Sequence, residues 1–204
     1  MIKRNVAPII SVIIIIASMY LIYNKLHIKK QQTNTGGAYT AKDGLNRERE
    51  LKKLELQSEK TRLGRLVLQD KDNNDIRLSD IIHGKRLVYA FSPGSCFACV
   101  ETDIGHIKKL SRITGKNKIL VITNYDNFRY YKIFINQMKL GINCYNSKTG
   151  LGLEIENDRN NIPFYFVIGD KKVVGFVHAR KENDSAGDAY FTKVITYLKN
   201  GQKQ

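Results

Sequence analysis

Residues 86–100 read Arg86-Leu-Val-Tyr-Ala-Phe-Ser-Pro-Gly-Ser-Cys-Phe-Ala-Cys-Val100, and this stretch decides the fold. Its first part, residues 87–91, is a short apolar run of the length expected for a buried strand. Ser92-Pro93-Gly94 is a turn signal. From Val100 onward apolar residues recur at helical spacing, which predicts a helix that starts at the Cys96-x-x-Cys99 motif.

A Cys-x-x-Cys motif at the start of a helix is suited to dithiol redox chemistry. The N-terminal amides of a helix favour an anion, so the Cys96 sulfur can be held as a thiolate. Cys99 follows one turn later, near enough to form a disulfide or to release a mixed disulfide. Zinc is the alternative, but a structural site needs four ligands, and only Cys144 and four histidines that lack paired spacing in the sequence remain. We expect no metal and no cofactor.

Strand and helix patterns alternate on both sides of this motif. Before it, residues 65–69 and 76–78 flank a turn cluster and predict a β-hairpin, followed by one helical turn. After it come a strand at 118–124, a helix at 126–141 capped by Asp126, and a short strand at 142–145. A loop at 146–161, a Pro-led hairpin at 164–178 and a helix at 188–198 capped by Asp188 complete the chain's pattern.

This order of elements resembles the thioredoxin-like superfamily. More narrowly, the chain is similar to membrane-anchored thiol-disulfide oxidoreductases of the TlpA/ResA type over about residues 64–200. The matching features are the first hairpin, Leu78-Ser-Asp-Ile81 with Gly84-Lys85, the Cys96-x-x-Cys99 motif and Ile162-Pro163. The resemblance implies an α/β fold with a central mixed sheet flanked by helices and an N-terminal β-hairpin extension.

The resemblance also implies roles for four residues. Cys96 would be the exposed nucleophile that attacks a disulfide, and Cys99 the buried resolving thiol. Pro163 would be a cis-proline that faces the dithiol, since cis peptide bonds are almost confined to proline. Ile162 would present its backbone to an incoming substrate strand.

The chain departs from the family pattern near the motif. Ser95 stands where an aromatic residue, often Trp, is usual, and the chain contains no Trp. Ala90 stands where thioredoxin has a buried acid that helps to deprotonate the second cysteine. Either another acid helps to deprotonate Cys99 or none does; Glu101, Glu154 and Glu156 are the alternatives, and the sequence does not choose among them.

The N-terminal region predicts a membrane anchor. Residues 1–5 are short and basic, and residues 6–23 contain no charged residue, which is about one bilayer crossing. A cleaved signal peptide is the alternative, but Ala17-Ser18-Met19 is a poor cleavage site. We therefore predict one transmembrane helix at 6–23 and a single-pass protein of the cell membrane, with its catalytic domain on the extracytoplasmic (periplasmic) side.

The region between the anchor and the domain is polar and charged. Residues 24–63 are predicted to form a flexible tether with Gly36-Gly37, followed by a solvated spacer helix over about 43–62. The thioredoxin-like domain is predicted to span residues 64–204.

The charge of the chain bears on its partners. The formal net charge is +15; 12 basic and 5 acidic residues precede Gly64, and 22 basic and 14 acidic residues follow from there. The excess is therefore spread along the chain, which favours contact with anionic lipid over nucleic-acid binding. The predicted partners are membrane lipid, thiols or disulfides of exported proteins, and a membrane or extracytoplasmic electron donor.

Alternatives to a thiol-disulfide oxidoreductase remain open. One is an assembly or maturation factor with a thioredoxin-like binding domain. Another is a thiol peroxidase, although Pro93-Gly94-Ser95 does not match the peroxiredoxin pattern. Cys144 is either a buried or partly buried free thiol or an additional redox thiol. His106 and His178 are predicted to lie on the surface.

Overall fold

The computed structural model describes residues 41–158, 160–169, 173–180 and 185–200. The predicted anchor at 6–23 and the predicted tether before residue 41 lie outside these ranges. The chain divides into two compact units, Met1–Arg47 and Glu48–Gln204. Within the described ranges, none of the helices has both the length and the apolar character needed to span a membrane.

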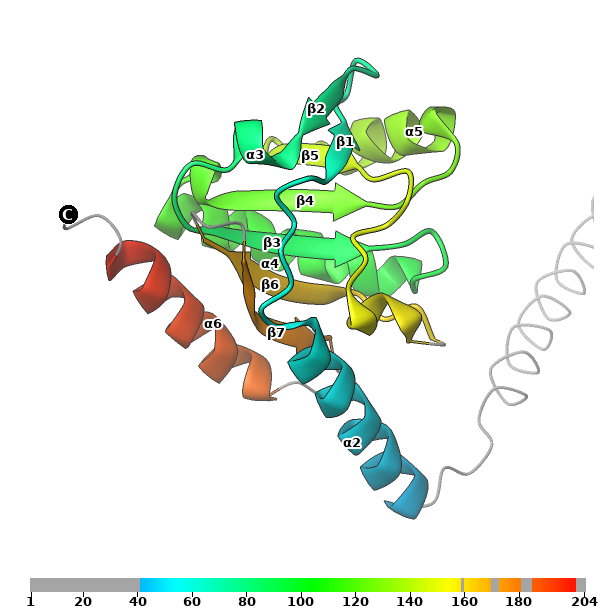
Figure 1. Ribbon diagram of the computed structural model, residues 1–204, viewed down its shortest axis with the longest axis vertical. Helices are drawn as coiled ribbons and strands as arrows, with labels where there is room; N and C mark the ends of the chain where they lie inside the picture. Colours follow the sequence, from blue (N-terminus) through cyan, green and yellow to red (C-terminus); the bar gives the residue numbers. More distant parts are fainter. Residues whose placement is uncertain (1–40, 159, 170–172, 181–184, 201–204) are drawn as a thin grey trace, which may run out of the picture. The chain divides into compact units, whose positions relative to one another are not determined.

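A seven-stranded mixed sheet forms the centre of the second unit (Figure 1). The strand order is β2-β1-β5-β4-β3-β6-β7. β3 pairs in parallel with β4 and antiparallel with β6. The strands are β1 Val67–Gln69, β2 Asp75–Arg77, β3 Arg86–Phe91, β4 Ile119–Thr123, β5 Asn143–Asn146, β6 Phe164–Ile168 and β7 Val174–Ala179.

Both faces of this sheet are covered, so the central strands are buried at every position. The α-helices are α2 Ala41–Ser58, α3 Leu78–Ile81, α4 Phe97–Thr114, α5 Phe128–Met138 and α6 Ser185–Lys199, with 3₁₀ turns η1 Lys116–Lys118 and η2 Glu154–Asn157. Apolar residues of α4, α5 and α6 pack on one face in a single cluster. Residues of α2, α3 and the segment around η2 pack on the other face.

The predicted order of elements is confirmed, and with it the α/β class, the mixed sheet and the N-terminal hairpin. Two predicted helix caps are wrong. The Asn127 side chain, one residue after Asp126, accepts the N–H of Arg129 and caps α5. α6 begins at Ser185, which places Asp188 in its first turn. Polar residues adjacent to a helix start compete for the cap, and backbone geometry selects among them.

The predicted spacer helix is not solvated along its whole length. Leu51 in its second half belongs to the hydrophobic core. The buried Glu55 carboxylate accepts the N–H of Ala179 at 2.8 Å, and the buried Ser58 hydroxyl accepts the N–H of Ile155 at 2.8 Å. The prediction of a solvated helix is therefore wrong for Leu51, Glu55 and Ser58, because Leu51 packs in the core and the other two side chains accept backbone N–H groups far along the chain. The positions between them, 52, 53, 56 and 57, are exposed.

The same packing overturns the surface prediction for His178. Its ring stacks on Tyr190 at 4.6 Å, and its Nδ1 lies 3.9 Å from Glu55 Oε1. The side chain is only 12% exposed because α2 and α6 flank the end of β7 that carries it. His106, by contrast, is exposed on α4, as predicted.

β7, at one edge of the sheet, is irregular. Tyr165 pairs with His178 and Val167 with Gly175, so Phe176 and Val177 together face the single residue Phe166. Phe176 has a positive φ of 55°, which is uncommon for an aromatic residue. The strand is therefore bulged at this point.

Candidate functional site: a dithiol at the start of α4

Cys96 and Cys99 form a disulfide at the N-terminus of α4. β3 ends at Phe91, and a turn closed by the Ser95 N–H and the Ser92 carbonyl leads to Cys96. Cys96 is the N-cap, and its sulfur accepts the N–H of Cys99 at 3.3 Å. Cys96 is exposed, whereas Cys99 is half-buried. A sulfur anion at position 96 would therefore lie at the positive end of an 18-residue helix.

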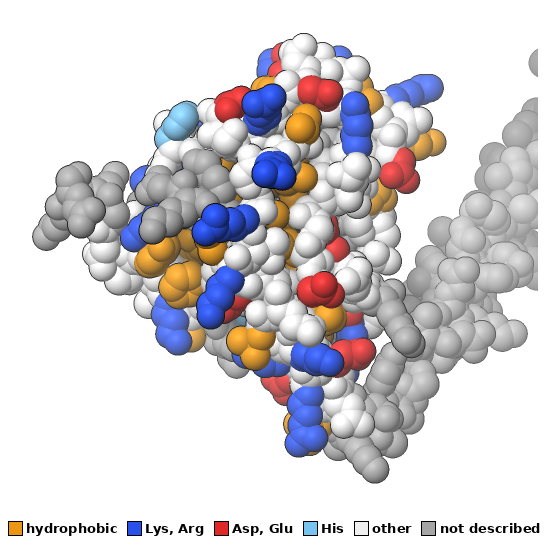
Figure 2. All heavy atoms as spheres, in the orientation of Figure 1, with side chains coloured by type: hydrophobic (Ala, Val, Ile, Leu, Met, Phe, Trp, Pro, Cys, Tyr) orange, Lys and Arg blue, Asp and Glu red, His pale blue; other side chains and the backbone are white. Residues whose placement is uncertain are grey.

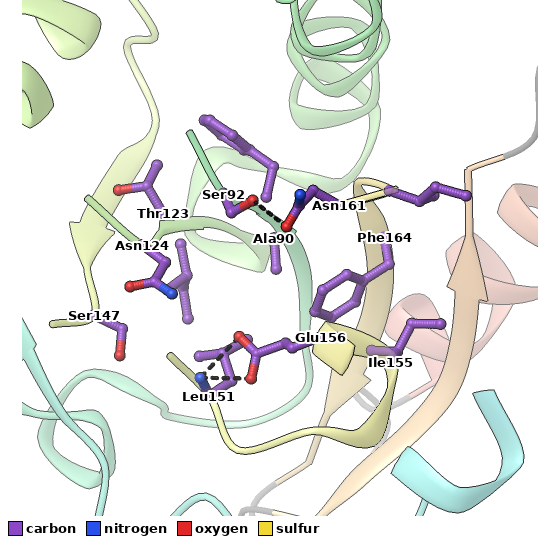
Figure 3. Close-up of a pocket in the computed structure, with 13 residues that line it drawn as sticks. Ala90, Ser92, Thr123, Asn124, Ser147, Leu151, Ile155, Glu156, Asn161 and Phe164 are labelled. Atoms are coloured by element: carbon purple, nitrogen blue, oxygen red, sulfur yellow. Dashed lines mark hydrogen bonds between the residues drawn. The ribbon is translucent and has the colours of Figure 1, made fainter. Parts of the chain in front are cut away.

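The loop before Pro163 lies directly against this turn. The Ser95 hydroxyl donates to the Asn161 carbonyl at 2.6 Å, and the Ser92 hydroxyl donates to Asn161 Oδ1 at 3.4 Å (Figure 3). Gly94 lacks a side chain at the closest approach, where a Cβ would lie 2.8 Å from Asn161 Nδ2. The structure thus brings the dithiol turn and the predicted substrate loop together.

The cis bond predicted at Pro163 is wrong. Every peptide bond in the described ranges is trans, that between Ile162 and Pro163 included. Trans is the intrinsically favoured isomer of an X–Pro bond. Asn161, two residues before Pro163, adopts a left-handed conformation with φ 49°. Pro163 is buried and its carbonyl accepts the N–H of Arg180 at 2.9 Å, whereas Ile162 is half-buried.

A buried acid absent from the predicted alternatives lies on the inward face of the dithiol helix. Asp103, one turn after Cys99 on α4, accepts the Tyr89 hydroxyl at 3.0 Å and the Arg180 Nε–H at 3.0 Å. Burial raises the pKa of Asp103, and the hydrogen bond and charge of Arg180 oppose that shift. Burial likewise raises the pKa of Tyr89, which remains a neutral donor.

Asp103 and Arg180 link the two halves of the site. Asp103 belongs to the dithiol helix, and Arg180 follows β7 and bonds to the Pro163 carbonyl through its backbone N–H. The sequence signal for Asp103 is its place in the inward stripe with Val100 and Ile107, at spacing i, i+3, i+7. A polar residue in such a stripe is buried when it has partners.

The three predicted acids lie in different environments. Glu101 and Glu154 are exposed. Glu156 lines a cavity of about 90 Å³ at the ends of β3 and β4, together with Ala90 (Figure 3). Its carboxylate accepts the backbone N–H groups of Leu151 and Leu153, at 2.8 and 3.1 Å. Of the three, Glu156 alone shares a cavity with Ala90.

Cys144 lies in β5, separated from β3 by β4. It is a free cysteine, and burial raises the pKa of its thiol to about 12. A thiol with so high a pKa is protonated at neutral pH and is a poor nucleophile. The Cys144 side chain is half-buried, which agrees with the reading of a buried or partly buried free thiol.

Basic side chains on the face seen in Figure 2 are scattered, and acidic ones lie among them. Two exposed lysines have acidic partners: Lys52 pairs with Glu55, and Lys148 pairs with Asp75. The charge excess of the described part therefore does not gather into one patch on this face.

The sheet order and the dithiol at the start of α4 together define a thioredoxin-like fold. Solved structures share it. The chain superposes on the thioredoxin domain of a thiol-disulfide oxidoreductase from Bacteroides vulgatus with TM-score 0.51 and 12% identity, covering 69% of this chain and 97% of that one. A protein from Chlorobium tepidum described as the thiol:disulfide interchange protein DsbE gives TM-score 0.52 and 12% identity, covering 67% and 97%.

A protein from Aquifex aeolicus described as an electron transfer protein gives TM-score 0.51 and 11% identity, covering 71% of this chain and 96% of that one. No family model matches the chain, and no curated protein matches it in sequence. At these identities the structural similarity establishes the fold.

Proposed function

We propose that this chain is a thiol-disulfide oxidoreductase whose Cys96–Cys99 pair exchanges electrons with cysteines of other proteins. One observation carries the proposal: an exposed Cys96 at the N-cap of α4 forms a disulfide with the half-buried Cys99. The helix N-terminus stabilises the thiolate that forms when this disulfide is reduced. The chain is similar in structure to the thioredoxin domain of a solved thiol-disulfide oxidoreductase, and this similarity supports the same chemistry.

The exchange proceeds in two balanced steps in the reducing direction. The Cys96 thiolate attacks one sulfur of a substrate disulfide; a mixed disulfide forms, and the other substrate sulfur leaves as a thiolate. The Cys99 thiolate then attacks the Cys96 sulfur and releases the second substrate thiolate. The substrate gains two electrons and the protein becomes the Cys96–Cys99 disulfide. The reverse sequence oxidises a substrate dithiol.

We also propose that residues 6–23 anchor the chain once in the cell membrane, with the domain on the extracytoplasmic side. Their 18 uncharged positions support a membrane span. The substrates would be exported proteins with cysteines, and the electron donor a membrane or extracytoplasmic dithiol protein. Tethering raises the effective concentration toward partners in the same membrane. Alkaline extraction of membranes tests the anchor, and release of the chain into the soluble fraction would contradict it.

The redox proposal is tested with single cysteine variants of the full chain. We expect Cys96→Ser to abolish insulin disulfide reduction. Cys99→Ser should accumulate a mixed disulfide that a reductant releases, because the resolving thiol is missing. Cys144→Ser is the matched control and should retain activity. Unchanged activity in both Cys96→Ser and Cys99→Ser would overturn the proposal.

A further inference from the structure

Large apolar side chains are exposed beside the dithiol. Phe97, between the two cysteines, is 61% exposed, Tyr130 on α5 is 61% exposed and Ile133 is 41% exposed. All three line one hollow of about 400 Å³. Its apolar lining consists of Pro93, Phe97, Tyr125, Tyr130, Ile133 and Phe134.

The fold does not require these side chains to be apolar. α5 already buries Tyr131, Phe134 and Met138 against the sheet. Tyr130 and Ile133 belong to the outer face of the same short helix, where polar residues are usual. An exposed apolar cluster that packing does not explain marks a site of interaction.

The hollow is lined in part by residues next to the redox cysteines in the chain. Pro93 lies in the turn that leads to the dithiol, and Phe97 directly follows Cys96 in sequence. A substrate polypeptide whose sulfur bonds to Cys96 must therefore place a neighbouring part of its chain near Phe97. From there the hollow extends to Tyr130 and Ile133 on α5.

We infer that this hollow binds an aromatic or branched aliphatic side chain adjacent to the target cysteine of a substrate polypeptide. The inference rests on the proposed function and specifies its substrate class. Among the described residues that line the hollow, only Asp126 is charged. An apolar neighbour of the substrate cysteine is therefore favoured, and an acidic neighbour is disfavoured by desolvation and by the like charge of Asp126.

The test uses the reduced full chain in phosphatidylcholine nanodiscs and four peptides closed by a disulfide. The peptides differ only in the residue beside the attacked cysteine: Phe, Leu, Ser or Asp. We expect the second-order rate constant for reduction to fall in that order, by about tenfold from Phe to Ser. Tyr130→Ser and Ile133→Ser should each remove most of this preference.

Two controls separate the possible failures. Ile113→Ser changes a residue that is 57% exposed on the dithiol helix and lies outside the hollow, so the peptide preference should stay intact. Cystamine is a small disulfide without an apolar side chain, and its rate should be equal in all these variants. If the wild type does not reduce cystamine in a Cys96-dependent way, the proposed function itself is overturned.

The remaining outcomes concern the hollow alone. Normal cystamine reduction with equal rates for the Phe and Ser peptides would overturn the inference and leave the proposed function standing. A wild-type dimer in sedimentation that Tyr130→Ser converts to a monomer would assign the hollow to self-association, and would also overturn it.

Discussion

The hydroxyl of Ser95 donates a 2.6 Å hydrogen bond to the backbone carbonyl of Asn161, 66 positions along the chain. Ser95 immediately precedes the first redox cysteine, and Asn161 precedes Ile162-Pro163. This contact fixes the distance between the dithiol turn and the loop before β6. Its geometry depends on Gly94, whose missing side chain allows the two loops to touch.

Gly94→Ala should therefore destabilise the protein. The new Cβ would lie 2.8 Å from Asn161 Nδ2 and 3.0 Å from its Cγ, so the Asn161 side chain must move. We expect a loss of about 1 kcal/mol in the free energy of unfolding, measured by urea denaturation. In an Asn161→Gly background the loss should be smaller by at least about 0.5 kcal/mol, because glycine removes the clash and tolerates the positive φ. Additive effects in the double variant would contradict this explanation.

Asp103 should make stability depend on pH. Burial raises the pKa of this carboxyl above its ordinary value of 3.8, so the folded protein binds the proton more tightly than the unfolded chain. The stability that the Asp103 carboxyl contributes is therefore fully present below pH 3.8, and it is lost as the pH rises through the raised pKa of the folded protein. The unfolding free energy of wild type minus that of Asp103→Asn should thus fall as pH is raised from 3, and then level off.

Urea denaturation at a series of pH values measures this difference, with the protein kept oxidised so that the dithiol does not titrate. A difference that rises with pH would mean that Arg180 outweighs burial and that the pKa of Asp103 is lowered instead.

Ser58→Ala tests whether α2 is part of the domain. The hydroxyl of Ser58 donates to the Leu54 carbonyl and accepts the N–H of Ile155, both at 2.8 Å, and the residue is fully buried. Alanine leaves the Ile155 N–H without this acceptor, so we expect a loss of about 1–3 kcal/mol in unfolding free energy. Gln57→Ala, at the exposed neighbouring position, is the control and should change stability by less than about 0.5 kcal/mol. Equal losses would show that α2 does not pack as described.

Cys144 should resist alkylation in the folded protein. Because burial raises the pKa of its thiol to about 12, very little thiolate exists at pH 8. With Cys96 and Cys99 oxidised, iodoacetamide should leave the native chain unmodified and should add one group in urea, as measured by mass spectrometry. The stability that this thiol contributes persists below its ordinary value of 9.0 and declines above it. Rapid modification of the native chain would instead favour an additional redox thiol.

The central strands and the dithiol helix could be predicted because their signals are local. The apolar run before Cys96 is continuous, since β3 is covered on both faces, and the stripe from Val100 onward repeats at helical spacing. The position of Cys96 at the helix start follows from these two patterns alone.

The features that sequence reasoning missed depend on distant partners. Asp103 is buried because Tyr89 and Arg180 satisfy it, and no local pattern identifies a tyrosine and an arginine as its partners. The packing of α2 relies on backbone N–H groups of Ala179 and Ile155, 124 and 97 positions from their acceptors. The Ile162-Pro163 motif does not by itself fix the isomer of the peptide bond, and this bond is trans.

The bulge at Phe176 hinders edge-to-edge pairing between the sheets of neighbouring molecules on a surface. A flat edge strand offers unpaired N–H and C=O groups to a neighbouring chain, and such edges lead to aggregation. The extra residue in β7 shifts its register against β6. Next to β7, Arg62 and Val173 form an isolated antiparallel β-bridge. β2 at the opposite edge spans only three residues. The domain can therefore be held at high local density without its sheets joining edge to edge.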